Sequence, residues 1–167
     1  MKKRIYFILT LVVLASCSQD VTFNDKAAFQ GVKDNEFWIA SDAKAAITNN
    51  NKLTIEAVTL NEKLTLKMPL PTTIVTQKNK NTYITHVLGT SETKKASYIK
   101  ILNLTEFLYQ TGTSIGDGEI IITDYDGTTV SGTYRFNAEN ADPDSTENPI
   151  VNLQNGVFYK VPIVPAL

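Results

Sequence analysis

The chain has 167 residues, a formal net charge of −1, one cysteine and one histidine. This length corresponds to one domain of ordinary size or two very small ones. A lone cysteine excludes a disulfide framework. One cysteine and one histidine are too few for a Cys/His zinc site. The near-neutral charge argues against a nucleic-acid-binding protein. The sequence does not identify an activity, but it predicts a destination, an anchor and a fold.

The N-terminus has the three-part layout of a secretory signal peptide over residues 1–16. A cationic start at residues 2–4 precedes the apolar run Ile5–Leu14. As a helix this run spans only about 15 Å, which is too short to cross a bilayer. The next residues, Leu14-Ala15-Ser16-Cys17, resemble the bacterial lipobox. The resemblance implies that Cys17 is acylated and begins the mature chain, which is then held at a membrane by lipid and does not span it.

Residues 17–28 are expected to contain the lipidated cysteine and a polar tether. In similar lipoproteins an aspartate after the cysteine commonly retains the protein at the inner membrane, and here that position is Ser18. The resemblance therefore favours the outer membrane of a Gram-negative cell. Asp20 and Asp25 are too few for a clear surface-export signal. The expected location is the cell envelope, with the surface and periplasmic leaflets both open.

Residues 29–167 predict a single all-β domain, because β-branched and aromatic residues recur in short runs between turn signals and no segment holds a helical period. The expected architecture is an antiparallel β-sandwich or a partly open β-barrel of about eight to ten strands. The candidate strands are Glu36–Ser41, Lys52–Asn61, Lys63–Met68, Thr82–Leu88, Ala96–Leu102, Glu106–Thr111, Glu119–Tyr125, Thr129–Asn137, Ile150–Gln154 and Val157–Ile163.

One hairpin can be predicted in register. A three-residue loop, Tyr125-Asp126-Gly127, would pair Ile122 with Val130 and bring the apolar faces of the two strands together. Gly127 would then take the positive-φ position of a G1 bulge.

The segments Gly118–Asp126 and Val130–Phe136 resemble a hairpin found in small lipoproteins of Bacteroidota-type bacteria. Leu153–Tyr159 and the start of the domain, Phe37–Ala40 followed by Lys52–Ile55, are similar to the same proteins. These families have no known function. The resemblance supports the fold and the location and implies no active site.

Few residues suggest chemistry. His86 lies in a candidate strand without a recognisable nucleophile motif, so a structural role is favoured. The Asp124–Gly127 segment lacks the remaining ligands of a calcium loop and is interpreted as a turn. The acidic stretch 139–148 offers oxygen ligands for calcium at Glu139, Asp142, Asp144 and Glu147. A solvated loop without a cofactor is the favoured interpretation of this stretch.

Phe37 and Trp38 are adjacent in a candidate strand, so their side chains should point to opposite faces and one should lie outside the main core. Trp38 is the candidate for contact with a ligand. The leading hypothesis is a non-enzymatic envelope lipoprotein that binds a glycan or a protein. The alternatives are a structural subunit of an envelope complex and, third, a carboxylate-based envelope hydrolase.

Overall fold

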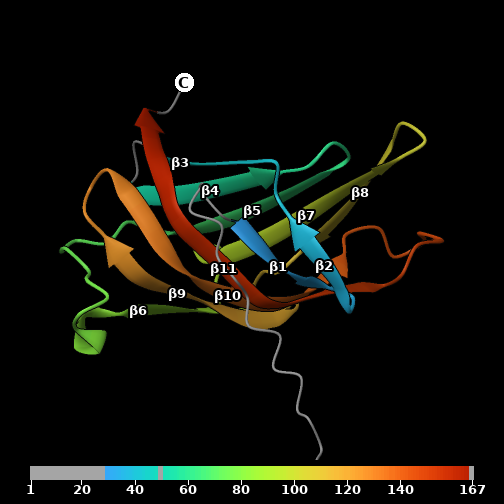
Figure 1. The fold of residues 1–167 in the computed structure, drawn as a ribbon. Helices are drawn as coiled ribbons and strands as arrows, with labels where there is room; N and C mark the ends of the chain where they lie inside the picture. Colours follow the sequence, from blue (N-terminus) through green and yellow to red (C-terminus); the bar gives the residue numbers. More distant parts are fainter. Residues whose placement is uncertain (1–28, 49–50, 166–167) are drawn as a thin grey trace, which may run out of the picture.

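The computed structural model describes residues 29–48 and 51–165, and these residues form one sheet of eleven strands (Figure 1). Cys17 and the expected tether lie outside them. The strands are β1 (Phe29–Lys33), β2 (Glu36–Ile39), β3 (Asp42–Thr48), β4 (Lys52–Val58), β5 (Glu62–Pro69), β6 (Ile84–Leu88), β7 (Lys95–Leu102), β8 (Thr105–Gln110), β9 (Asp117–Tyr125), β10 (Thr129–Asn140) and β11 (Ile150–Pro165). A 3₁₀ turn, η1 (Lys80–Thr82), is the one helical element of the described chain. No helix in these ranges has the length and apolarity to cross a membrane.

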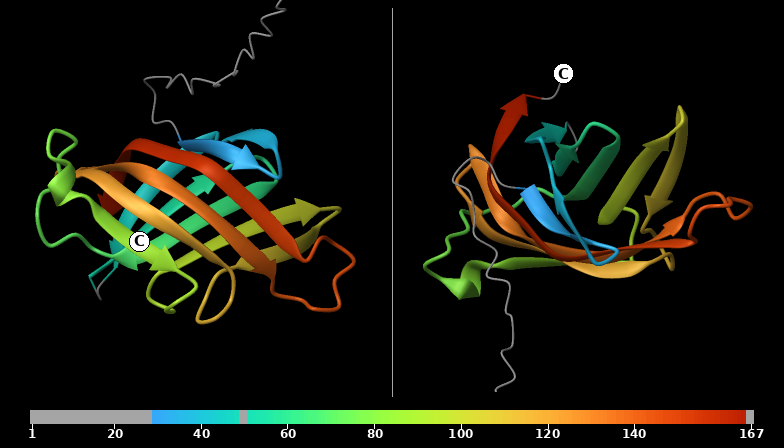
Figure 2. Two further views of the ribbon diagram at one scale, coloured as in Figure 1. Left: turned by 90° about the horizontal axis from the view of Figure 1, so that it is seen from below. Right: turned by 45° about the vertical axis from the view of Figure 1, so that its right-hand side comes forward.

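Seven strands form a ring in the order β11-β3-β4-β5-β7-β8-β10, because β10 pairs again with β11. The pairing of β11 with β3 is parallel and the other pairings are antiparallel, which confirms the prediction of an all-β, largely antiparallel domain. Figure 2 shows β10 and β11 crossing one side of the ring with β3, β4 and β5 behind them.

The long strands β10 and β11 each have two successive neighbours on their outer edges. Strand β10 pairs with β9 over residues 130–137 and with β8 only at residues 139–140. Strand β11 pairs with β1 over residues 153–158 and with β3 over residues 163–165. The pairs β1–β2 and β9–β6 therefore extend the wall beside the ring.

The interior follows from the alternation of side chains along each strand. Leu53 and Ile55 on β4 and Leu64 and Leu66 on β5 are completely buried. Tyr134 and Phe136 face the same core from β10, while Thr133 and Arg135, which alternate with them, are exposed.

Strands β1 and β3 were not predicted. Strand β3 contains three alanines, a residue depleted in strands, and Ala43 and Ala45 supply only small buried side chains. The two predicted C-terminal strands are one continuous strand, β11. The expected break at Asn155-Gly156 is a bulge, with Asn155 at a positive φ of 51°.

The predicted register of the β9–β10 hairpin is wrong. Val130 pairs with Tyr125 and Ser131 with Asp124, and after a bulge Gly132 pairs with Ile122. Gly127 does have a positive φ, at 88°. The apolar faces still coincide, because the bulge shifts the pairing inside the hairpin rather than at its loop.

Candidate functional site

Two bulges flank the same point of β10. On β9, Thr123 lies between the residues that pair with Ser131 and Gly132, so Thr123 has no partner residue on β10. On β11, Tyr159 and Lys160 together face Ser131. The backbone of Lys160 has a φ of 48°, and its N–H donates to Ser131 Oγ at 2.9 Å. Bulges turn side chains out of the regular pleat and are frequent beside binding sites.

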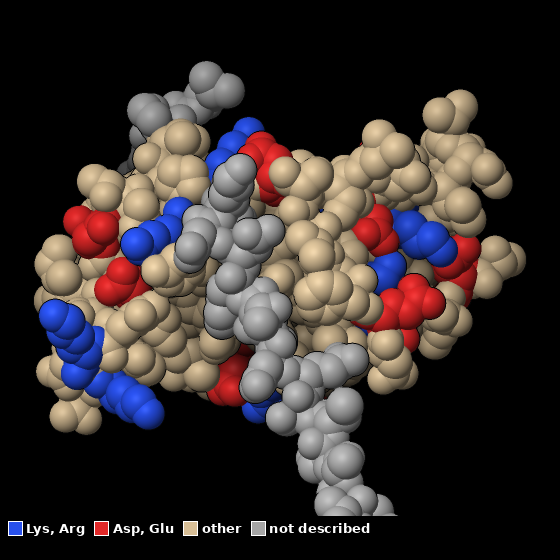
Figure 3. Space-filling model, in the orientation of Figure 1, with Lys and Arg blue, Asp and Glu red and all other residues tan. Residues whose placement is uncertain are grey.

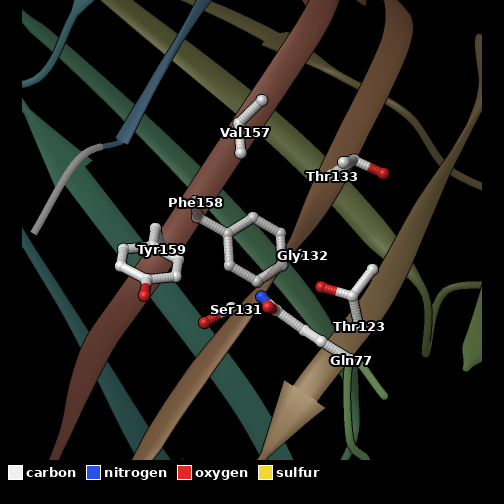
Figure 4. Close-up of a pocket in the computed structure, with 8 residues that line it drawn as sticks. All are labelled: Gln77, Thr123, Ser131, Gly132, Thr133, Val157, Phe158 and Tyr159. Carbon is white, nitrogen blue, oxygen red and sulfur yellow. The ribbon is translucent and has the colours of Figure 1, made fainter. Parts of the chain in front are cut away.

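A groove of about 400 Å³ lies between these bulges (Figure 4). It crosses β9, β10 and β11, and Gln77 enters it from the loop that joins β5 to β6. Its volume falls within the ordinary range for small-ligand sites. The described residues that line it are Gln77, Thr123, Ser131, Gly132, Thr133, Val157, Phe158 and Tyr159.

The floor of the groove is joined to the core. The ring of Phe158 covers Gly132, where an added Cβ would lie 2.5 Å from the ring's Cζ. Phe158 is itself completely buried and stacks on Phe29 with ring centroids 5.9 Å apart. A floor packed in this way is held rigidly, which lowers the entropic cost of binding a ligand.

None of the described lining residues is charged. Hydroxyl and amide groups line the groove beside the ring of Tyr159, so the site can exchange hydrogen bonds and make apolar contact. The Lys160 ammonium lies 5.3 Å from the centroid of the Tyr159 ring, a cation–π contact that holds the ring at the margin. Acid–base chemistry near neutral pH has no group to perform it among these residues.

A second polar cluster, centred on Glu62, lies elsewhere and contains Trp38. Lys33 Nζ donates to Glu62 Oε1 at 2.6 Å, Tyr98 Oη donates to the same oxygen at 2.5 Å, and Trp38 Nε1 donates to Oε2. Trp38 is 5% exposed and packs edge-on against Phe29, whereas Phe37 is 61% exposed. The prediction that these neighbours face opposite sides is confirmed. The ligand contact proposed for Trp38 stays a prediction, at a position inside the core.

The Glu62 cluster keeps its carboxylate ionised. Burial raises the pKa of Glu62. The hydrogen bonds from Lys33, Tyr98 and Trp38, together with the charge of Lys33, lower it by more than burial raises it, so the pKa lies below its ordinary value. Burial and the bond to Glu62 raise the pKa of Tyr98, which stays protonated and donates. The hydrogen-bond donors to the Glu62 carboxylate are side chains of the domain itself. They lie on β1, β2 and β7, so the cluster joins these strands to β5.

Three of the four acids proposed as calcium ligands, Glu139, Asp142 and Glu147, accept hydrogen bonds from separate donors. Glu147 forms an ion pair with Lys100 at 2.9 Å, and Glu139 accepts the N–H of Gly116 at 3.0 Å. Asp142 Oδ1 accepts the N–H of Asp144 within the loop. Within the described ranges, no group of three or more acidic, histidine or cysteine side chains is placed to hold a metal ion. Calcium binding remains an untested hypothesis.

His86 lies on β6 and is 6% exposed. Burial, with a smaller contribution from the charge of Lys94, lowers its pKa below the ordinary value, so the imidazole is neutral at pH 7. Its position in the wall of the core agrees with the structural role favoured from the sequence.

The sequence did not identify the groove. Its residues come from three strands and one loop, and the two bulges that create it have no simple sequence pattern. Ser131, Gly132 and Thr133 were assigned to a strand without a functional role. The positive φ of Lys160 was the feature hardest to predict from the sequence, because lysine has no preference for that conformation.

Residues 25–162 match a domain family that is described as a domain of unknown function (DUF6252). No curated protein and no solved structure is significantly similar to the chain.

Proposed function

This chain belongs to the DUF6252 family, and we propose that it is a lipid-anchored protein of the cell envelope whose β domain binds an uncharged, hydroxyl-rich ligand without catalysis. The observation that carries the binding function is the groove between the two bulges. The anchor is supported by the sequence alone, through the apolar run at residues 5–14 and the lipobox that ends at Cys17.

The chemistry of the groove favours a neutral glycan as the ligand. Saccharides offer many hydroxyl groups and apolar C–H faces, and the groove offers neutral hydrogen-bonding side chains beside aromatic Tyr159. An anionic or cationic ligand would lose its hydration there without gaining an opposite charge from any described lining residue.

The anchor is tested by isolating the protein from membranes of the cells that express it and measuring the mass of its N-terminal peptide. We expect acylated Cys17 at the N-terminus and loss of membrane association in the Cys17→Ala protein. An unmodified Cys17 in a membrane-free protein would overturn this part of the proposal.

The binding function is tested with an array of neutral and charged oligosaccharides. We expect the mature protein to retain neutral oligosaccharides, and Thr133→Arg, which places a long charged side chain at the exposed rim of the groove, to abolish the signal. Thr54→Arg is the matched control, because Thr54 lies on β4, outside the groove. Binding that survives Thr133→Arg, or that is confined to charged glycans, would contradict the assignment.

A further inference from the structure

The hairpin of β7 and β8 projects from one end of the ring as an apolar finger, which we define as residues 101–108 (Figures 1 and 3). Leu104 at its tip is 98% exposed. Leu102 is exposed on one face of the hairpin, and Ile101 and Leu108 are exposed on the other. The outermost residues, 101–105, carry no charge, and the projecting end is tan on the face that Figure 3 draws. The first charged residue behind the tip is the exposed Glu106, which pairs with Ile101.

The turn at the tip holds two residues other than glycine in a strained backbone conformation. Leu102 pairs with Thr105, so Asn103 and Leu104 form a two-residue loop, with φ values of 50° and 66°. Asparagine is common at the first position of such a loop, but the second usually has glycine, because side chains are strained at positive φ. Leucine here adds strain and exposes an apolar side chain, and the fold gains no packing from it.

A second apolar tip lies beside the finger. Leu60, in the turn between β4 and β5, is 93% exposed. The N–H of Ile101 donates to the carbonyl of Asn61 at 2.8 Å, which places the two turns at the same end of the ring. The residues of the Leu60 turn, 59–61, are also uncharged.

We propose that the tip of the apolar finger, residues 102–105, and Leu60 insert into the lipid bilayer that holds the acylated N-terminus, with Glu106 left at the level of the headgroups, and so fix the orientation of the domain on the membrane. This inference rests on the lipid anchor in the proposed function. Apolar side chains on both faces and at the tip of a narrow hairpin suit an environment that surrounds the hairpin, as lipid does. Burying each leucine removes apolar surface from water, and the uncharged tips avoid the cost of moving charge toward the hydrocarbon.

The geometry of the chain permits this orientation. Strand β8 meets β10 at Glu139, whereas the groove lies at Gly132, about 23 Å away at 3.3 Å per strand residue. The tether joins the domain at the level of the groove, because Phe29 pairs with Phe158 and Phe158 pairs with Gly132. From Cys17 to Phe29 it can extend about 40 Å, which is enough to run back toward the finger. A domain that rests on its finger can therefore stay attached to its lipid while the groove faces away from the membrane.

The test uses the mature, lipidated protein in vesicles of phosphatidylethanolamine and phosphatidylglycerol with brominated acyl chains, which quench tryptophan fluorescence on contact. Leu104→Trp is the reporter, and Leu60→Trp is a second reporter if the first does not fold. Ile74→Trp is the matched control, because Ile74 is also an exposed apolar residue but lies next to Val75, which bridges to Tyr125 at the groove end of β9. The native Trp38 is buried and supplies a constant background.

We expect the emission at position 104 to fall several-fold in brominated vesicles and the emission at position 74 to stay unchanged. Vesicle flotation of the same samples reports the anchor separately. If the protein floats but position 104 is not quenched, or if both positions are quenched equally, the insertion is overturned while the anchor stands. A protein that does not float would contradict both the anchor and the insertion.

Discussion

Single residues decide how closely the long strands approach. Tyr134 lies across Gly156, where an added Cβ would be 2.4 Å from the ring, and its hydroxyl donates to the carbonyl of Gln30 at 3.2 Å. Gly156→Ala must therefore displace the Tyr134 ring, and overpacking of this kind costs about 1–3 kcal/mol. Denaturant unfolding should show this loss of stability.

Gly127→Ala is the control for this prediction. Gly127, unlike Gly156, has a positive φ, and no atom lies within 4 Å of an added Cβ, so this substitution introduces backbone strain without overpacking. A Gly156→Ala protein that is no less stable than Gly127→Ala would contradict the packing of Tyr134.

Leu104 should be replaceable with a gain in stability. Its φ of 66° suits glycine, so Leu104→Gly is expected to stabilise the domain by up to about 1 kcal/mol despite the greater flexibility of the unfolded chain. Thermal unfolding measures this change. A clear fall in Tm would mean that leucine serves the fold, and it would remove one argument for an external contact.

The buried histidine predicts a pH dependence. The pKa of His86 is lower in the folded protein than in the unfolded chain, so the unfolded state binds the extra proton first. Stability should be complete above about pH 6.5, the ordinary histidine pKa, and fall as the pH is lowered from there. Because His86 is the only histidine, His86→Leu should remove this slope between pH 7 and 5. An unchanged slope would place its origin elsewhere.

At the scale of elements, the Glu62 cluster joins the β1–β2 pair to the ring. Glu62→Gln keeps the shape but removes the charge that Lys33 requires, and a hydrogen bond to a charged group contributes about 1.5–3 kcal/mol. We expect Glu62→Gln to lower the free energy of unfolding by about this amount at pH 7. The difference should shrink below about pH 4.5, as the lowered pKa of Glu62 is approached and the parent loses its own charge.

Glu56→Gln is the matched control for this element. The Glu56–Lys63 pair is 3.9 Å long and solvent-exposed, so its loss should change stability little. Equal effects of the two substitutions would show that the Glu62 cluster does not hold β1 and β2 in place.

The elements also show what a sequence can predict. Leu64, Leu66 and Met68 alternate with other residues and predicted strand β5 and its buried face, because successive side chains of a strand point to opposite faces. Strand β3 was not predicted because its buried residues are alanines, which also occur often at exposed positions and do not mark a buried face. Bulges shift the register within a strand, and the residue types at Thr123 and Lys160 do not predict such a shift. The site depends on those shifts, so its location required the structure.

At the scale of the whole molecule, the groove and the apolar finger lie far apart along β10. The groove lies near the start of β10, and the apolar finger lies near its end, where β8 joins. The seam between β8 and β10 contains only two residue pairs, at Glu139 and Asn140, so the hairpin that bears the finger is attached mainly through the pairing of β7 with β5. In the proposed arrangement, the lipid and the finger face the membrane while the groove is presented to a ligand.

The most direct test of this account maps where the ligand binds. Amide chemical shifts of the mature protein would be followed during titration with the neutral oligosaccharide that the array retains best. We predict that the changes centre on Thr123, Ser131–Thr133 and Tyr159, with the Glu62 cluster and the apolar finger unaffected. Changes that centre elsewhere, or no saturable change at any residue, would contradict the assignment of the groove as the binding site.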